Sequence, residues 1–265
     1  MYATSVLFTL LFGGSVFVWC QLAGRWRRRE PFLDLNQEPR ADWRSAGEFA
    51  GVYVVLFWTV NLLLPYFISR PIDPHQVIGL KSVVVSAAVN FGLALVLPLM
   101  LVSSGRPCFD FGITTLNCRD QIATGFRGFF AAVLPMAISM AAMTPFRGPE
   151  NQHSFLKLLS ESPGSTTVAL VAVTAVLSAP LQEEMTFRVI LQGWLATLFP
   201  PSVAIGVVAT VFAFVHGWRD GLALLPLAII LGYVFHRRHS YLAVVVIHAL
   251  FNATMLALQL LMPEK

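Results

Sequence analysis

The sequence predicts an all-α protein, a polytopic membrane helix bundle with about eight transmembrane helices. Of its 265 residues, 56% are hydrophobic and only 12% are charged, and the mean hydropathy is +0.69. A soluble domain carries about 25% charged residues, roughly twice that fraction. Lipid is therefore the expected solvent for most of the surface. We expect one integral membrane domain over residues 1–265, in a multi-pass protein of the cell or inner membrane.

Eight apolar segments approach the ~20 residues that an α-helix needs to cross a bilayer. In chain order they are residues 3–22, 49–69, 82–103, 128–145, 166–197, 202–216, 221–236 and 240–262. The first is predicted to be a retained span and not a signal peptide, because no basic segment precedes it and no clear small-residue cleavage site follows. The second to fourth and the eighth rest on apolar length alone.

The fifth, sixth and seventh segments have further signals. The fifth is longer than one span requires, so we expect it to be tilted or to protrude. Pro200 and Pro201 should end it and begin the sixth, since proline disrupts helix interiors but suits a first turn. The sixth and seventh are short, and only a turn at 217–220 separates them.

Basic residues concentrate in the loops. The first loop, residues 25–48, alone carries six arginines, and such residues in short loops favour the cytoplasmic side. This predicts eight spans with both termini outside. Positive loops beside a membrane account for the net charge of +4, so the bilayer is the expected partner and nucleic acid is not.

Two adjacent glutamates, Glu183 and Glu184, stand within the strongly apolar stretch 170–198, and Arg188 follows four residues after the second. Charges inside a membrane persist mainly where they pair, face a bundle interior or line a water-filled cavity. The pattern therefore predicts a functional site. The i,i+4 spacing of Glu184 and Arg188 predicts an ion pair that keeps the helix rigid and locally neutral.

Two histidines can meet these glutamates inside the bundle. At ~1.5 Å per residue, Glu183 and His216 lie about 25 and about 22 Å from the turn at Pro200 and Pro201, so they are roughly level. His248 lies within the last span, and Asn252, four residues later, shares its helix face. We expect all four side chains to converge within the membrane.

The three motifs Glu183-Glu184-x-x-x-Arg188, Phe212-x-x-x-His216 and His248-x-x-x-Asn252 occur in order in separate apolar helices. This arrangement resembles the CPBP family of intramembrane proteases, also called Abi or CAAX proteases, which includes the eukaryotic prenyl-protein endopeptidases. The resemblance covers residues 183–252 and implies a motif-bearing catalytic core at about 166–262. One departure is Val189, where many relatives have glycine after the arginine.

The resemblance implies an endopeptidase with catalytic residues Glu183, Glu184, Arg188, His216, His248 and Asn252. Glu183 with His216 would activate water for attack on a peptide carbonyl, while His248 and Asn252 would hold the oxyanion or position the water. The chemistry is reasonable in itself, because a desolvated glutamate can act as a general base and a histidine can direct the proton. An uncharged donor to the oxyanion is worth about 3 kcal/mol in other proteases.

A metal is the open alternative for this site. Glu183, His216 and His248 make a common catalytic zinc set with one position left for water. Asn252 is a weak zinc ligand and a good hydrogen-bond donor, so the metal-free glutamate mechanism is preferred.

Other functions remain in competition with proteolysis. They are a membrane scaffold, an immunity factor and a proton-coupled transporter, since intramembrane carboxylates and histidines also form proton relays. Every ionisable group well inside a span lies after residue 180, which favours one enzyme site over a transport path. The expected substrate is a peptide or a membrane-protein segment, and the sequence does not say whether it is prenylated.

Overall fold

The structure is a computed structural model that describes residues 2–36, 41, 43, 45–68, 79–146, 158–159, 161–162 and 164–262. The described part is helical and contains no strand, which confirms the predicted fold class. Its membrane-length elements are α1 (Tyr2–Arg27), α2 (Gly47–Ile68), α3 (Leu80–Ser103), α4 (Cys118–Met143), a composite fifth helix, α9 (Pro201–Val215), α10 (Trp218–Arg238) and α11 (Tyr241–Leu261). Two 3-10 turns, η1 (Cys108–Phe111) and η2 (Thr144–Phe146), flank α4.

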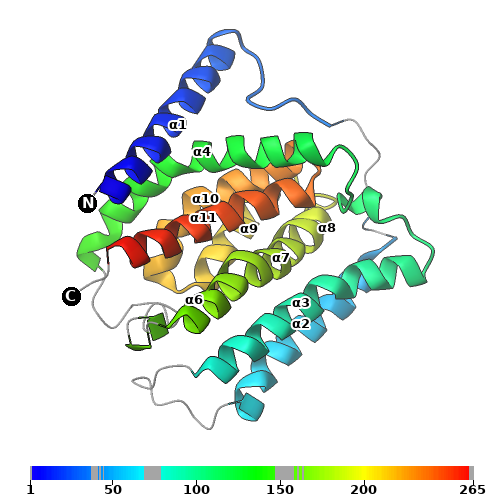
Figure 1. Cartoon of the computed structure of the whole chain (residues 1–265). Helices are drawn as coiled ribbons and strands as arrows, with labels where there is room; N and C mark the ends of the chain where they lie inside the picture. The colour runs from blue at the N-terminus through cyan, green and yellow to red at the C-terminus, as the bar shows by residue number, and fades with distance from the viewer. Residues whose placement is uncertain are drawn as a thin grey trace.

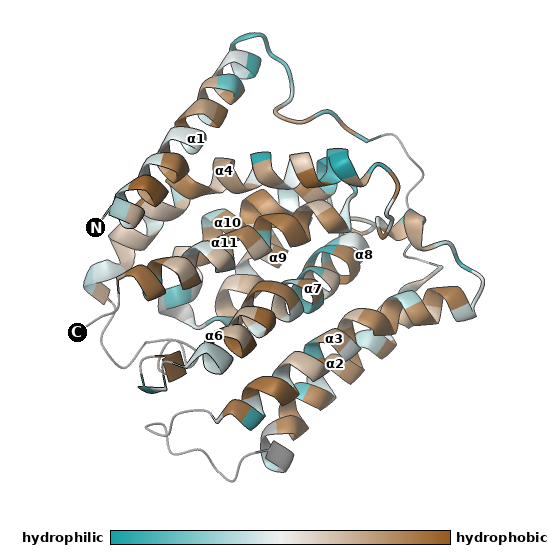
Figure 2. Ribbon diagram, viewed as in Figure 1, coloured by the Kyte–Doolittle hydropathy of each residue, from teal (hydrophilic) through white to brown (hydrophobic). Residues whose placement is uncertain are grey.

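Seven helices of the described part are long and apolar enough to cross a membrane. The eighth, α9, has 15 residues, which is about 22 Å at 1.5 Å per residue. The start of α1 and the end of α11 lie at the same end of the bundle (Figure 1), as an even number of passes requires. Brown, apolar ribbon dominates the long helices in Figure 2, so the surface suits a lipid environment.

The motif-bearing helices lie at the centre of the bundle. α10 packs against α9 and α4, and α11 packs against α4 and the composite helix. α3 covers the other face of the composite helix, with α2 beside it, and α1 crosses α4 at the opposite edge (Figure 1). The main core joins side chains from both halves of the chain, including Leu97, Met136, Met185, Leu231 and Ile247.

The composite fifth helix runs from residue 165 to 195 and is long, as predicted. It consists of α6 (Ser165–Ala172), η4 (Val173–Ser178), α7 (Ala179–Glu184), η5 (Met185–Gln192) and α8 (Gly193–Leu195), in which η4 and η5 are π-helical. Pro180 follows η4 closely and cannot donate a backbone hydrogen bond, which gives a reason for the wider turn just before it. Such widened turns are frequent at functional sites, and here they flank the two glutamates.

The predicted start of the fourth span was wrong, because α4 begins at Cys118 and not at 128. The first turns of α4 are polar, and residues from other parts of the chain stabilise them. Asp120 pairs with Arg238 at the end of α10, while Gln121 accepts a hydrogen bond from Ser240 Oγ at 2.5 Å. Apolar length alone could not reveal these partners.

The predicted four-residue turn between the sixth and seventh spans was also wrong. α9 ends at Val215 and α10 begins at Trp218, so the turn is two residues long. Gly217 has φ +82°, a conformation that favours glycine. Asp220 lies in the first turn of α10, where the helix dipole favours an acidic side chain.

Candidate active site

Glu183 and Glu184 end α7, next to the π-helical segment η5. Adjacent helical residues point in different directions, and the two carboxylates meet different surroundings. The Glu184 side chain is fully buried, whereas 21% of the Glu183 side chain is exposed. The structure therefore separates the roles that the two glutamates can take.

Both oxygens of Glu184 are engaged. Its Oε2 accepts a hydrogen bond from Arg188 Nε at 3.0 Å, with both side chains fully buried. The ion pair predicted from the i,i+4 spacing is thereby confirmed. Its Oε1 lies 2.7 Å from His248 Nδ1, which ties the composite helix to α11. Charges this deeply buried persist only when paired and hydrogen-bonded.

Glu183 faces both histidines. Its Oε2 lies 3.7 Å from His216 Nε2 and 3.9 Å from His248 Nε2, and it has no hydrogen-bond partner among the described residues. These separations exceed a direct hydrogen bond and suit a bridging water. Of the four side chains expected to converge, the structure thus brings Glu183, His216 and His248 together from separate helices.

Each histidine is oriented by its other ring nitrogen. His216 Nδ1 lies 2.7 Å from the carbonyl oxygen of Phe212, and His248 Nδ1 lies against the Glu184 carboxylate. Both partners only accept hydrogen bonds, so each Nδ1 carries the proton. In the neutral rings, the two Nε2 lone pairs are therefore directed to the side of Glu183.

The turn between α9 and α10 fixes the position of His216 at the end of α9. Gly221 in α10 comes so close to α9 that a Cβ atom there would overlap the backbone carbonyl of Ala213. Its own N–H donates to the carbonyl of Gly217 at 2.7 Å. Only glycine permits this approach, which aligns the end of α9 with the glutamates.

Phe212 lies at the centre of the cluster. Its ring centroid is 4.4 Å from that of His216 and 6.0 Å from that of His248. The Arg188 guanidinium carbon lies 5.2 Å from the same centroid, within the range of a cation–π contact. The i,i+4 spacing places Phe212 and His216 on one helix face, with packing as the expected role of the phenylalanine, whereas its contacts with His248 and the buried cation were missed.

Asn252 lies one turn beyond His248 on α11, but its side-chain amide donates to the carbonyl of Ala175 in η4 at 2.7 Å. That bond uses one of its two N–H groups. The predicted oxyanion role therefore rests on the second N–H.

Two tyrosines that no sequence motif indicated support the motif helix. Tyr241 Oη donates to the carbonyl of Leu181 at 2.7 Å. Tyr53 Oη lies 3.0 Å from Thr186 Oγ1, which also accepts from Gln182 Nε2 at 2.7 Å. In the sequence, only the polar residues beside the glutamates, Gln182 and Thr186, indicated such contacts.

The zinc alternative can be tested against these distances. Ligand atoms around a tetrahedral zinc lie about 3.3 Å apart, from bonds of about 2.0–2.1 Å. The Oε2–Nε2 separations at Glu183 are 3.7 and 3.9 Å, and the described residues contain no His, Cys, Asp and Glu group placed to hold a metal ion. The donor chemistry suits zinc, but the side chains as placed are too open for it.

Helices of membrane-crossing length surround a buried cluster of carboxylates and histidines. This combination is typical of an integral membrane protein with a hydrolase-like site. The family model of the Rce1-like type II CAAX prenyl endopeptidases matches residues 165–254, from the start of α6 into α11. This segment therefore forms a domain of the Rce1-like CAAX prenyl endopeptidase (CPBP) family, a family of proteases, as the motifs predicted. No curated protein and no solved structure matches the chain.

Proposed function

We propose that the protein is an intramembrane endopeptidase in which Glu183 and His216 activate a water molecule. The observation that carries the proposal is the position of Glu183 Oε2, 3.7 and 3.9 Å from two histidine Nε2 atoms on different helices. One water within about 2.8 Å of both Glu183 and His216 fits this separation. Both side chains are partly exposed, whereas Glu183 Oε2 itself is buried and has no hydrogen-bond partner among the described residues, so a water there would satisfy it.

The proposed reaction begins with proton transfer from this water to the Glu183 carboxylate. The water oxygen forms a bond to the carbonyl carbon of the substrate and creates a tetrahedral oxyanion. Collapse of the oxyanion breaks the C–N bond, and the proton held by Glu183, directed by His216, goes to the leaving amine. Water is the only co-reactant, and its atoms are divided between the two products.

His248 and Asn252 are the proposed oxyanion donors. The Glu184 carboxylate on Nδ1 compensates the charge of a protonated His248, whose Nε2–H then points to the reaction centre. Asn252 would supply its second N–H. Glu184 and Arg188 do not touch the substrate in this scheme and act as positioning residues that hold His248.

The proposed substrate is a peptide or a membrane-protein segment that enters the bundle. The name of the matched family refers to CAAX prenyl substrates, but none of the contacts among the described residues recognises a prenyl group. Zinc held by Glu183, His216 and His248 stays the alternative to the metal-free mechanism.

The test is cleavage of a peptide library and a membrane-protein pool by the purified full chain in lipid. We expect Glu183→Gln and His216→Ala each to lower the rate by about 10²-fold or more. Glu48→Gln, at an exposed acid in α2, is the matched control and should retain activity. Equal activity in wild type and both site variants would exclude this site.

A chelator distinguishes the two mechanisms in the same assay. Unchanged cleavage after treatment with a zinc chelator supports the metal-free mechanism. Loss of cleavage that returns on addition of zinc would establish the metal alternative. If no form cleaves any substrate, the scaffold, immunity or transport functions gain support.

A further inference from the structure

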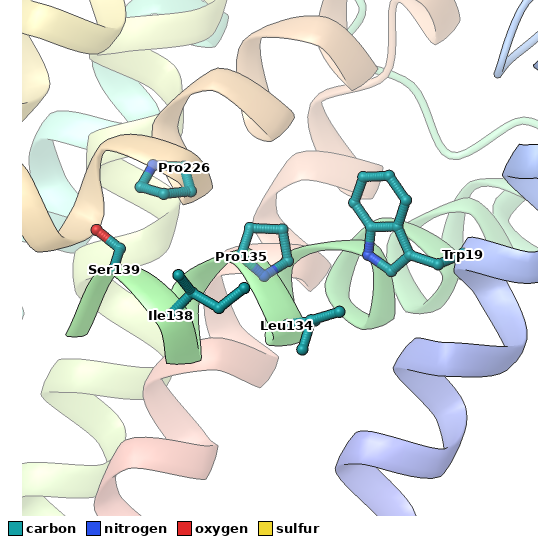
Figure 3. A pocket seen from close by; sticks show the side chains of 6 residues that line it. All are labelled: Trp19, Leu134, Pro135, Ile138, Ser139 and Pro226. Atoms are coloured by element: carbon teal, nitrogen blue, oxygen red, sulfur yellow. The ribbon is translucent and has the colours of Figure 1, made fainter. Parts of the chain in front are cut away.

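An apolar groove of about 570 Å³ lies between α1, α4 and α10, away from the glutamate and histidine cluster. Its lining residues are Trp19, Leu134, Pro135, Ile138, Ser139 and Pro226. Figure 3 shows these side chains around the groove, with Trp19 projecting from α1 toward α4. The groove lies among helices of membrane-crossing length, so hydrocarbon is the medium that reaches it.

The two prolines explain why the groove is apolar. Proline has no N–H, so the carbonyl four residues earlier loses its helical partner. Before Pro135, the carbonyl of Ala131 instead accepts from Trp19 Nε1 at 3.2 Å. Before Pro226, the carbonyl of Leu222 accepts from Ser139 Oγ at 3.2 Å. Because both carbonyls are satisfied by side chains, the groove offers ring and alkyl surface to a ligand.

The face of α4 that lines the groove carries a cationic side chain two turns earlier in the helix. Arg127, Ala131, Leu134 and Ile138 follow the spacing i, i+4, i+7 and i+11, so they share one face of α4. Arg127 precedes Pro135 by two turns, about 12 Å along the helix. It is exposed and makes no ion pair with a described residue.

One face of α1 packs against the same part of α4. Ser15 Oγ accepts a hydrogen bond from the Leu134 backbone N–H at 3.2 Å, and Trp19 contacts α4 one turn later. From this crossing the two helices diverge toward the end of α1 (Figure 1). Exposed Arg27 ends α1 and forms no ion pair with a described residue, whereas Arg25 pairs with Asp34 at 2.7 Å.

We propose that an anionic phospholipid binds in this wedge, with one acyl chain in the groove. Its phosphate lies between Arg127 on α4 and Arg27 on α1, and the chain passes over Ala131 to Trp19 and Ile138. The rise of about 12 Å along α4 from Arg127 to Pro135 matches the length of the part of an acyl chain nearest the glycerol. A phosphate diester and a long alkyl chain are the two features that arginines above an apolar groove recognise.

The test is native mass spectrometry of the full chain, titrated with phosphatidylglycerol or with phosphatidylcholine of identical acyl chains. We expect one phosphatidylglycerol to bind more tightly than phosphatidylcholine. Arg127→Gln should weaken phosphatidylglycerol binding about fivefold, the loss of one basic contact near a membrane surface, and Arg127→Lys should restore most of it. Ile138→Trp, which fills the groove, should weaken the binding of both lipids.

Arg119→Gln is the matched control, since Arg119 is an exposed arginine of the same helix and lies outside the groove. It should leave lipid binding unchanged. Equal binding of the two lipids, equal effects of the Arg127 and Arg119 variants, or competition by soluble glycerol phosphate alone would overturn the proposal. Because lipid binding is measured without substrate, its outcome is independent of the proposed peptidase activity.

Discussion

The buried pair of Glu184 and Arg188 permits a quantitative test by a double-mutant cycle. Both side chains are fully buried, and Nε and Oε2 are 3.0 Å apart. Removal of one partner of such a pair costs about 3–5 kcal/mol, whereas replacement of both is often nearly neutral. We therefore expect Glu184→Gln and Arg188→Met each to lower the free energy of unfolding by that amount, and the double variant to cost at least about 3 kcal/mol less than the sum of the two single changes.

The two single variants should differ in a direction that the structure sets. Arg188→Met leaves the Glu184 carboxylate beside His248 Nδ1 at 2.7 Å, so that charge keeps a partner. Glu184→Gln leaves the Arg188 guanidinium without its buried carboxylate, and the Phe212 ring, whose centroid is 5.2 Å away, does not replace that charge. Glu184→Gln should therefore be the more destabilising change.

The assay is unfolding in mixed micelles by titration with a denaturing detergent, for wild type, both single variants and the double variant. Arg28 and Glu30 supply the matched control, since they pair at 2.8 Å with both side chains exposed. The coupling free energy of that pair should be no more than about 1 kcal/mol. Equal coupling for the buried and the exposed pair would refute the structural role given to Glu184 and Arg188.

Two further variants test the site geometry. Gly221→Ala places a methyl group on the carbonyl of Ala213, so we expect a loss of about 1–3 kcal/mol in stability and at least tenfold slower cleavage. Gly206→Ala, where a Cβ has open space, should be neutral or stabilising by up to about 1 kcal/mol, and similar losses in both would contradict this account. Asn252→Ala removes the bond to Ala175 at a cost of about 1 kcal/mol in stability, but should slow cleavage about 10²- to 10³-fold if Asn252 stabilises the oxyanion. A rate loss no larger than the stability loss explains would limit Asn252 to a structural role.

The helices and the site cluster were predictable because each depends on a local pattern. Apolar length revealed the spans, and equal distances from the turn at Pro200 and Pro201 placed Glu183 level with His216. The i,i+4 spacing of Glu184 and Arg188 likewise gave their ion pair. These predictions needed no knowledge of which helices are neighbours.

The features that were missed depend on tertiary neighbours. The polar start of α4 is stabilised by Arg238 and Ser240, which are far away in the sequence. Spacing put Asn252 on the face of His248 but could not name Ala175 as its partner. Tyr241 gave no motif, although its hydroxyl anchors the helix that carries both glutamates.

The short length of α9 bears on how the reaction obtains water. A helix of about 22 Å falls short of a hydrocarbon core of about 30 Å, and it ends at Val215, directly before His216. Backbone outside a helix is stable at membrane depth only beside protein or water, unless the bilayer becomes thinner there. Either a hydrated inlet or a local depression of the membrane follows at the turn between α9 and α10. Both bring solvent toward Glu183 and His216, so the same turn that aligns the histidine would also supply the reactant for the proposed hydrolysis within a lipid layer.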